Sequence, residues 1–235
     1  SKQINMKNNF KEIYNDSLNN PDEFWKSISE DVFWFRKPTK ILNKSKPPFY
    51  KWFEDGITNT CYNALDTHID QGRGDKTALI YDSPITGNKA KFTFNQLKKK
   101  VSKFASALDN QGVTKGDRVI IYMPMIPEAV VAMLACGRIG AIHSVVFGGF
   151  ASNELASRID DSKAKILITA SCGFEPGRTV EYRPLVDSAL KLAKHKVKKV
   201  ILYQRKDHEV KLNEPLEISW EESLDNASEK DCVEM

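Results

Sequence analysis

The chain has 235 residues, of which 41% are hydrophobic and 28% are charged, as in an ordinary globular protein. This composition excludes collagen, a coiled coil and low-complexity disorder. The formal net charge of +4 is too small to indicate a nucleic-acid-binding protein. No stretch approaches the ~18 unbroken apolar residues of a membrane span. At ~150 residues per domain, the length fits one large domain or one and a half.

The charge is distributed unevenly along the chain. Residues 213–235 hold eight acidic residues and one lysine, whereas residues 178–211 hold ten basic residues and four acidic ones. The basic stretch has two interpretations: a solvated face, which is the commoner case and is favoured here, or a surface for an anionic ligand.

The cysteines indicate neither a zinc site nor a disulfide scaffold. They stand at positions 61, 136, 172 and 232, with no C-x-x-C pair and no histidine at metal-ligand spacing. The first five residues contain no apolar signal core. We therefore expect a reducing, cytoplasmic location, or the mitochondrial matrix if the source is eukaryotic.

Residues 1–57 are rich in aromatic side chains and differ from the rest of the chain. Pro21, followed by Asp22 and Glu23, predicts the start of a helix, because proline and acidic residues suit the first turn. So many aromatic residues need a surface to bury against, and we expect this part to be an ordered wrap on the main body.

From residue 59 onward the pattern alternates between helices and strands. Helices are expected at 59–69, from Thr93 to Gly112, and at 128–136, 151–161 and 184–193; strands are expected at 77–81, 117–123, 141–147, 165–170 and 200–203. Thr93 and Gln96 form a capping box, and Gly112 is typical of a helix end.

The strands from residue 117 onward are continuous apolar runs. Such runs, alternating with amphipathic helices, predict an α/β fold with a doubly wound, mostly parallel sheet covered by helices on both faces. In this arrangement the strand at 141–147 is buried, His143 is a core histidine, and Cys136 packs inside its helix.

Ligands of such sheets bind beyond the carboxyl ends of the strands, which directs attention to residues 124–127, 148–150 and 171–178. Gly148 and Gly149 lie between a strand and a helix. Either these glycines allow a ligand to approach the backbone closely, or they only allow the chain to make a tight turn. Arg178 ends the loop Glu175-Pro176-Gly177-Arg178 and presents a planar fork of donors suited to phosphate. Cys172 has no neighbouring base to activate it, which argues against a nucleophile.

Several signatures are missing from the sequence. It has no G-x-x-x-x-G-K-[ST] phosphate loop, no G-x-G-x-x-G after a strand and no G-x-S-x-G elbow. These absences argue against a Walker-type phosphate loop, a nicotinamide dehydrogenase and an esterase.

As a set, four segments resemble the acyl-adenylate-forming enzymes, in particular the AMP-forming acetyl- and propionyl-CoA synthetases. The segments are Thr93–Leu97, Gly116–Glu128, Gly140–Phe150 and Leu155–Asp161. The aromatic N-terminus is similar to the N-terminal extension of the same branch, so the resemblance runs from about Tyr14 to Cys232. The resemblance implies that residues 1–57 are that extension and that residues 58–235 are the first part of the AMP-binding domain.

The resemblance implies a two-step ligation of acetate or propionate to CoA, through an acyl-adenylate formed from ATP with Mg²⁺. It places the pantetheine of CoA beside Phe147, Gly148 and Gly149. The loop of Glu175, Pro176, Gly177 and Arg178 then approaches the phosphorylated end of CoA. Acetyl-CoA synthetases often begin this loop with arginine, whereas Glu175 stands here. The Glu-Pro-Gly-Arg form, followed by Val180-Glu181-Tyr182, is similar to the propionate-preferring branch.

The family's Ser/Thr/Gly-rich phosphate loop, acyl pocket, ribose-binding aspartate and C-terminal domain with its catalytic lysine do not occur in the sequence. The resemblance therefore implies the N-terminal part of a longer enzyme, with no catalytic residue and no metal ligand in this chain. We expect ATP and Mg²⁺ to bind mainly elsewhere, the chain to be inactive alone, and no nucleic-acid or membrane partner. Two alternatives remain: a stand-alone CoA- or nucleotide-binding module, and a nucleic-acid module built on the basic stretch at 178–211.

Overall fold

The structure is a computed structural model that describes residues 10–235. It divides into two compact units, the first ending at Thr58 and the second spanning Asn59–Val233. The first nine residues of the predicted N-terminal extension lie outside the described residues. Within residues 10–235, no helix is both long and apolar enough to cross a membrane.

The first unit contains two helices and a small hairpin: α1 (Phe10–Asn19), α2 (Pro21–Ser29), β1 (Leu42–Asn43) and β2 (Lys51–Trp52). The predicted helix start at Pro21 is confirmed, with two acidic residues in its first turn. The aromatic residues contact one another across this unit. Trp25 lies 5.8 Å from Trp52, and Trp34 lies 5.7 Å from Phe53, measured between ring centroids. These contacts explain how a short segment with little regular structure holds its shape.

The second unit begins with a helical segment at 60–73 that contains two π-helical stretches, η1 (Tyr62–Asp66) and η2 (Ile69–Arg73). Strands β3 (Thr77–Asp82) and β4 (Lys89–Thr93) form a separate antiparallel pair, of which only the first strand was predicted. Helix α3 (Phe94–Asn110) follows, and its predicted capping box between Thr93 and Gln96 is confirmed.

The main sheet has five parallel strands in the order β11-β10-β7-β5-β6. Their bounds are β5 (Arg118–Met123), β6 (Ile142–Phe147), β7 (Ile166–Ala170), β10 (Lys199–Tyr203) and β11 (Glu217–Ser219). The remaining elements are α4 (Pro127–Arg138), α5 (Ser152–Ser162), α6 (Tyr182–Leu192), α7 (Trp220–Ser223) and the hairpin β8 (Cys172–Glu175) and β9 (Arg178–Glu181).

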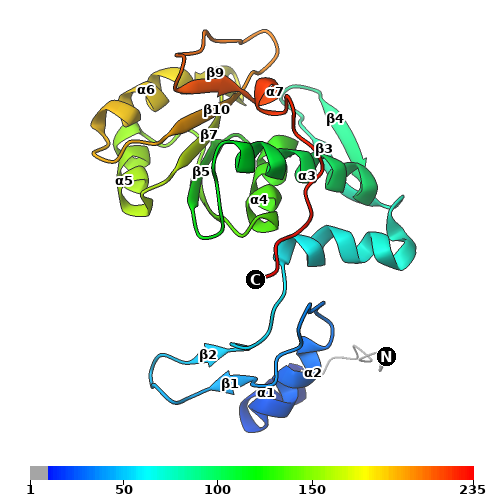
Figure 1. The fold of residues 1–235 in the computed structure, drawn as a ribbon. Helices are drawn as coiled ribbons and strands as arrows, with labels where there is room; N and C mark the ends of the chain where they lie inside the picture. The colour runs from blue at the N-terminus through cyan, green and yellow to red at the C-terminus, as the bar shows by residue number, and fades with distance from the viewer. Residues whose placement is uncertain (1–9) are drawn as a thin grey trace. The chain divides into compact units, whose positions relative to one another are not determined.

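Helices cover both faces of the sheet, with α3 and α4 on one side and α5 and α6 on the other (Figure 1). Alternate residues of β5 point to opposite faces of the sheet and pack into two different cores. Ile121 packs with α3 and α4, whereas Ile120 and Tyr122 pack with α5 and α6. Each face therefore has its own apolar core, and the predicted doubly wound α/β fold is confirmed.

The structure corrects the expected burial of the strand at 141–147. Strand β6 lies at the edge of the sheet, and two of its apolar side chains are largely exposed: Val145 is 55% exposed and Phe147 is 70% exposed. His143 is also exposed, so its prediction as a core histidine is wrong. Cys136 is fully buried, as predicted. The acidic segment after residue 213 contributes strand β11 and the short helix α7, which the sequence reasoning missed.

Candidate functional site

The carboxyl ends of the sheet strands meet at one edge, as the fold class requires. The register pairs Met123 with Phe147, Tyr122 with Thr169, and Tyr203 with Ala170. The loops after β5, β6 and β7 therefore begin at the same level of the sheet. They line a pocket of about 350 Å³ whose walls include Pro124, Phe147, Gly148, Glu175, Tyr182 and Arg205. The structure thus brings the predicted site residues Phe147, Gly148 and Glu175 to one pocket.

Tyr122 holds the loop of Gly148 and Gly149 in place from the end of β5. Its hydroxyl donates a hydrogen bond to the carbonyl of Phe150 at 2.9 Å and accepts one from the amide of Gly149 at 3.2 Å. Gly149 has a φ of +95°, a conformation that glycine adopts without strain. The pKa of Tyr122 is raised by burial, so the phenol stays protonated and keeps its donor.

Gly148 is required by close packing. A Cβ atom at this position would lie 2.1 Å from the Tyr182 hydroxyl and 2.9 Å from the carbonyl oxygen of Met123. The same hydroxyl would lie 2.9 Å from a Cβ at Gly173. Tyr182 therefore sits between the loop after β6 and the start of the hairpin, and its ring stacks on that of Tyr122 at 4.9 Å. Neither tyrosine was predicted as part of the site.

Arg178 does not point at the pocket as a free cation. It lies across the β8–β9 hairpin from Glu175, and its Nη2 is 2.6 Å from Glu175 Oε2. Both side chains are exposed, at 70% for Arg178 and 44% for Glu175. Gly177, with a φ of +74°, forms the turn with Pro176 between them. Glu175 thus offsets the charge of the predicted phosphate ligand and occupies its Nε and Nη2 donors.

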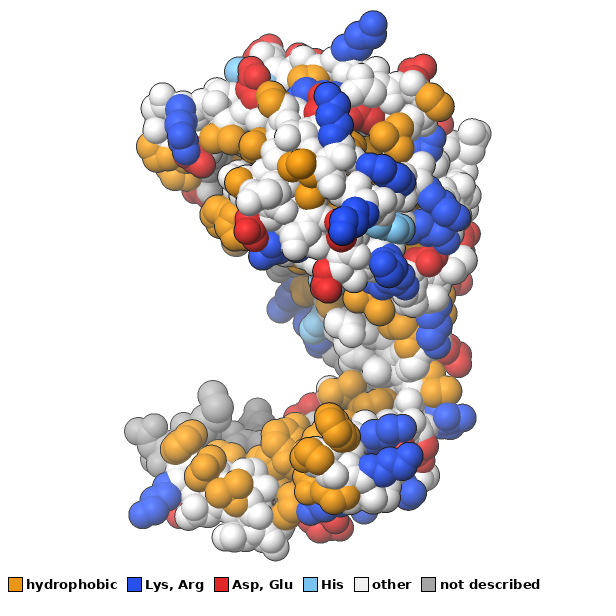
Figure 2. Space-filling view, turned by 90° about the vertical axis from the view of Figure 1, so that its left-hand side faces the viewer, with side chains coloured by type: hydrophobic (Ala, Val, Ile, Leu, Met, Phe, Trp, Pro, Cys, Tyr) orange, Lys and Arg blue, Asp and Glu red, His pale blue; other side chains and the backbone are white. Residues whose placement is uncertain are grey.

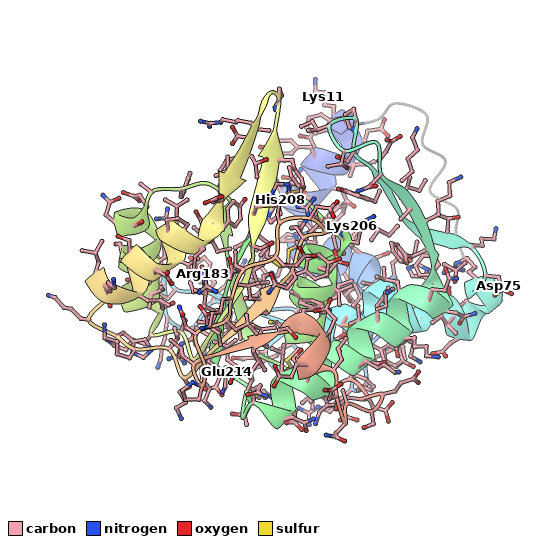
Figure 3. The ribbon with its side chains drawn as sticks, turned by 90° about the horizontal axis from the view of Figure 1, so that it is seen from above. Lys11, Asp75, Arg183, Lys206, His208 and Glu214 are labelled. Carbon is pink, nitrogen blue, oxygen red and sulfur yellow. The ribbon has the colours of Figure 1, made fainter. Side chains whose placement is uncertain are left out.

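Arg205 brings a positive charge to the pocket wall that the sequence reasoning did not single out. It follows β10, is 8% exposed, and its guanidinium lies 4.7 Å from the centroid of the Phe174 ring. Within residues 10–235 it has no carboxylate within ion-pair distance. His208 also contacts Phe174, at 5.1 Å between rings, and lies beside the hairpin in Figure 3. A signal was available, because Arg205 lies just beyond a predicted strand end.

Several side chains of the basic stretch at 178–211 make contacts within the fold. On the face that carries α5 and α6, basic and acidic side chains are interspersed (Figure 2). Arg183 of α6 pairs with Glu217 at 2.5 Å, and that carboxylate is 1% exposed. The two aromatic residues of the stretch are used inside the fold: Tyr182 stacks on Tyr122, and Tyr203 packs edge-on against Trp220. Both rings are therefore engaged with other aromatic side chains of the fold.

Cys172 is buried at the start of β8, and burial raises the pKa of its thiol. A thiol held in its protonated form is a poor nucleophile. Burial therefore does not favour Cys172 as a nucleophile.

Comparison with known proteins identifies the family. The model of the family described as "AMP-binding enzyme" matches residues 65–233, and that of the "Acetyl-coenzyme A synthetase N-terminus" matches residues 10–64. The chain therefore belongs to the AMP-binding enzymes, and it is similar to the N-terminal part of the short-chain acyl-CoA synthetases among them.

Individual relatives support the same family assignment. The chain is 50% identical over 218 residues to acyl-CoA synthetase short-chain family member 3, mitochondrial, of Homo sapiens, covering 92% of this chain and 32% of that protein. It is 45% identical over 205 residues to acetyl-coenzyme A synthetase of Streptomyces coelicolor, covering 87% of this chain and 31% of that protein. The chain thus spans about a third of the length of these relatives.

The fold is shared with a solved structure, acetoacetyl-CoA synthetase from Streptomyces lividans. The TM-score is 0.85 at 24% sequence identity, over 97% of this chain and 35% of that one.

Proposed function

We propose that the chain is the N-terminal part of an AMP-forming ligase that joins a short-chain carboxylate to CoA through an acyl-adenylate. The observation that carries the proposal is the match of nearly the whole chain to short-chain acyl-CoA synthetases, with 50% identity over 218 residues to one of them. Residues 1–57 are then the N-terminal extension of this enzyme class, and residues 58–235 are the first part of its AMP-binding domain.

In this proposal the chain contributes to the binding of CoA. The pantetheine passes Phe147, Gly148 and Gly149, where the two glycines leave the backbone open to a ligand. The phosphorylated end meets the loop Glu175-Pro176-Gly177-Arg178. Arg178 binds phosphate there after it leaves Glu175, and Arg205 adds positive potential from the pocket wall.

The chain is proposed to be inactive by itself. Its sequence contains no Ser/Thr/Gly-rich phosphate loop, so ATP and Mg²⁺ bind mainly to parts of the enzyme that this chain does not include. The same holds for the pocket of the carboxylate. Propionate is the favoured acid, and only the resemblance of the loop at 175–178 supports that choice. No nucleic-acid or membrane partner is proposed, and the location is cytoplasmic or, for a eukaryotic source, the mitochondrial matrix.

A chimera tests the proposal. Residues 10–235 replace the matching third of the Homo sapiens relative, and acyl-CoA formation is measured with acetate and propionate. We expect the chimera to form acyl-CoA and the isolated chain to show no ATP–pyrophosphate exchange. In the chimera, Arg178→Ala should raise the KM for CoA roughly tenfold, the value of one charge-assisted phosphate contact, with little change in pyrophosphate exchange.

The matched control is Lys230→Ala, because Lys230 is another cation in an ion pair, 2.8 Å from Asp109, and it does not line the pocket. It should leave the KM for CoA unchanged. A folded chimera without ligase activity, or exchange by the isolated chain, would contradict the proposal.

A further inference from the structure

Two cysteines that are far apart in the sequence meet in a buried cluster of charged groups. The cluster includes Arg138 of α4 and lies away from the pocket described above. Cys61 is fully buried and Cys232 is partly exposed. Their sulfurs lie within 4.8 Å of each other and of an Asp66 carboxylate oxygen. Arg138, which is 1% exposed, places Nη1 at 3.6 Å from Cys61 Sγ, 3.0 Å from Cys232 Sγ and 2.8 Å from Asp66 Oδ2.

The guanidinium of Arg138 argues against a metal ion among these groups. Two thiols and a carboxylate could ligate a cation by their types alone. However, Nη1 already contacts the same three ligand atoms, and Nη2 donates to Asp66 Oδ1 at 3.2 Å. A metal would have to displace a buried cation from its partner, which is costly.

The charges of the cluster favour one thiolate. Arg138 and Lys98, whose Nζ is 3.2 Å from Asp66 Oδ1, supply two positive charges against one carboxylate. A thiolate balances the remaining charge. A hydrogen bond from Cys232 is the main cause of the lowered pKa of Cys61; burial opposes it, and the hydrogen bond and charge of Arg138 lower the pKa further. The same hydrogen bond raises the pKa of Cys232. The thiolate therefore lies on Cys61, whereas Cys232 keeps its proton and is the sulfur nearer to solvent.

We propose that Cys61 and Cys232 are a redox pair that forms a reversible disulfide in the presence of a hydroperoxide. The thiolate attacks one peroxide oxygen, the O–O bond breaks, and the leaving oxygen departs as water after taking up a proton. The resulting sulfenic acid is attacked by the second sulfur, so that the S–S bond forms and a second water leaves. For hydrogen peroxide, both sulfurs are oxidised by one electron each and the peroxide is reduced to two waters.

The disulfide would fix the last described segment of the chain. After Ser223 this segment has no helix or strand, and hydrogen bonds hold it, such as Asn59 Nδ2 to the Val233 carbonyl at 2.8 Å, the Val233 amide to the Arg138 carbonyl at 2.8 Å and the Lys230 amide to the Ser102 carbonyl at 3.3 Å. Such a segment can move the sulfur of Cys232 the short distance to its partner. The covalent link would then join it to the helical segment at 60–73.

Peptide mapping tests the pair directly. The chain of 235 residues is treated with a small excess of hydrogen peroxide, denatured, alkylated and digested with trypsin without reductant. Trypsin cleavage after Lys51, Arg73 and Lys230 yields peptides 52–73 and 231–235. We expect these two peptides to be joined, two hydrogens lighter than their sum, and to separate when dithiothreitol is added. Cys136 and Cys172 should be recovered alkylated.

Two variants serve as controls. Cys136→Ala removes a cysteine whose thiol pKa is raised to about 12 by burial, and it should leave the joined peptides unchanged. Cys232→Ser should abolish them. Lys98→Gln, at a partly exposed position, should slow disulfide formation roughly threefold at neutral pH, because a lost neighbouring cation leaves less thiolate.

The proposal is overturned if Cys61 and Cys232 remain free thiols under these conditions, if each is oxidised separately without a link, or if Cys61 joins Cys136. An unchanged rate in Lys98→Gln would contradict the charge balance that we assign to the cluster.

Discussion

Two arginine–carboxylate pairs in this chain have similar distances and opposite surroundings. Arg138 and Asp66 lie 2.8 Å apart with side chains 1% and 7% exposed, whereas Arg178 and Glu175 lie 2.6 Å apart with side chains 70% and 44% exposed. Breaking a buried pair leaves an uncompensated charge, whereas water solvates the separated charges of an exposed pair at little cost in free energy. The first pair is therefore part of the structure, and the second can open to receive a ligand.

The largest expected effect is the loss of the buried pair. Asp66→Asn removes the charge that faces Arg138, and we expect the free energy of unfolding to fall by about 3 kcal/mol. Urea denaturation followed by circular dichroism measures this change. Glu175→Gln is the matched control, with an expected change below about 0.5 kcal/mol. Equal losses in the two variants would remove the distinction between the pairs.

A second, smaller loss is expected at the pocket. In Gly148→Ala the new methyl group meets the Tyr182 hydroxyl at 2.1 Å and the Met123 carbonyl oxygen at 2.9 Å. We expect a loss of about 2 kcal/mol, typical of overpacking. Tyr182→Phe removes the closer of the two atoms, so the double variant should lose less than the sum of the single ones. Strict additivity in thermal unfolding would show that the loop after β6 relaxes away from Tyr182.

The buried pair also predicts a pH dependence. Burial by itself would raise the pKa of Asp66, but the hydrogen bond and charge of Arg138, together with Lys98, hold it below its ordinary value. The stability that Asp66 contributes is therefore complete above the unfolded-state pKa of about 4 and is lost as the pH falls through the folded-state pKa. Urea titrations between neutral and acidic pH should show a steeper loss for the natural chain than for Asp66→Asn. Parallel curves would contradict the assignment.

The smallest effect concerns ligand binding at the exposed pair. Glu175→Gln frees Arg178 from its partner, and we expect CoA to bind roughly threefold more tightly, the value of an exposed ion pair. Calorimetry on the chimera measures this change. Dephospho-CoA, which lacks the 3′-phosphate, should show no gain. Weaker binding of CoA by the variant would mean that Glu175 itself contacts the ligand.

The fold followed from local patterns, whereas several details depended on sheet order. The apolar runs at 118–123 and 166–170 are central strands, as expected. The run at 142–147 also forms a strand, but most of its residues are exposed because sheet order places it at the edge, and no local pattern encodes that order. The hairpin β8–β9 was missed because Pro176 and Gly177 suggested only a loop.

The candidate site was predicted where the residue type itself carries the signal. Paired glycines after a strand and an arginine on a turn are visible in a sequence. Tyr122, Tyr182 and Arg205 were missed because a tyrosine or an arginine gains its role only from neighbours distant in the chain. The same reason hid the cluster of Cys61 and Cys232, which are brought together by contacts between the helical segment at 60–73, α4 and the last residues.

The most direct test of the proposed CoA-binding role is a nuclear magnetic resonance titration of the isotope-labelled chain with CoA up to roughly 10 mM, a range that detects weak binding. The account predicts shifted amide signals at Gly148, Gly149 and Gly177, and loss of the Gly177 shift when dephospho-CoA replaces CoA. Unshifted signals at these three glycines, or shifts confined to the separate apolar pocket beside Lys99 and Trp220, would contradict it.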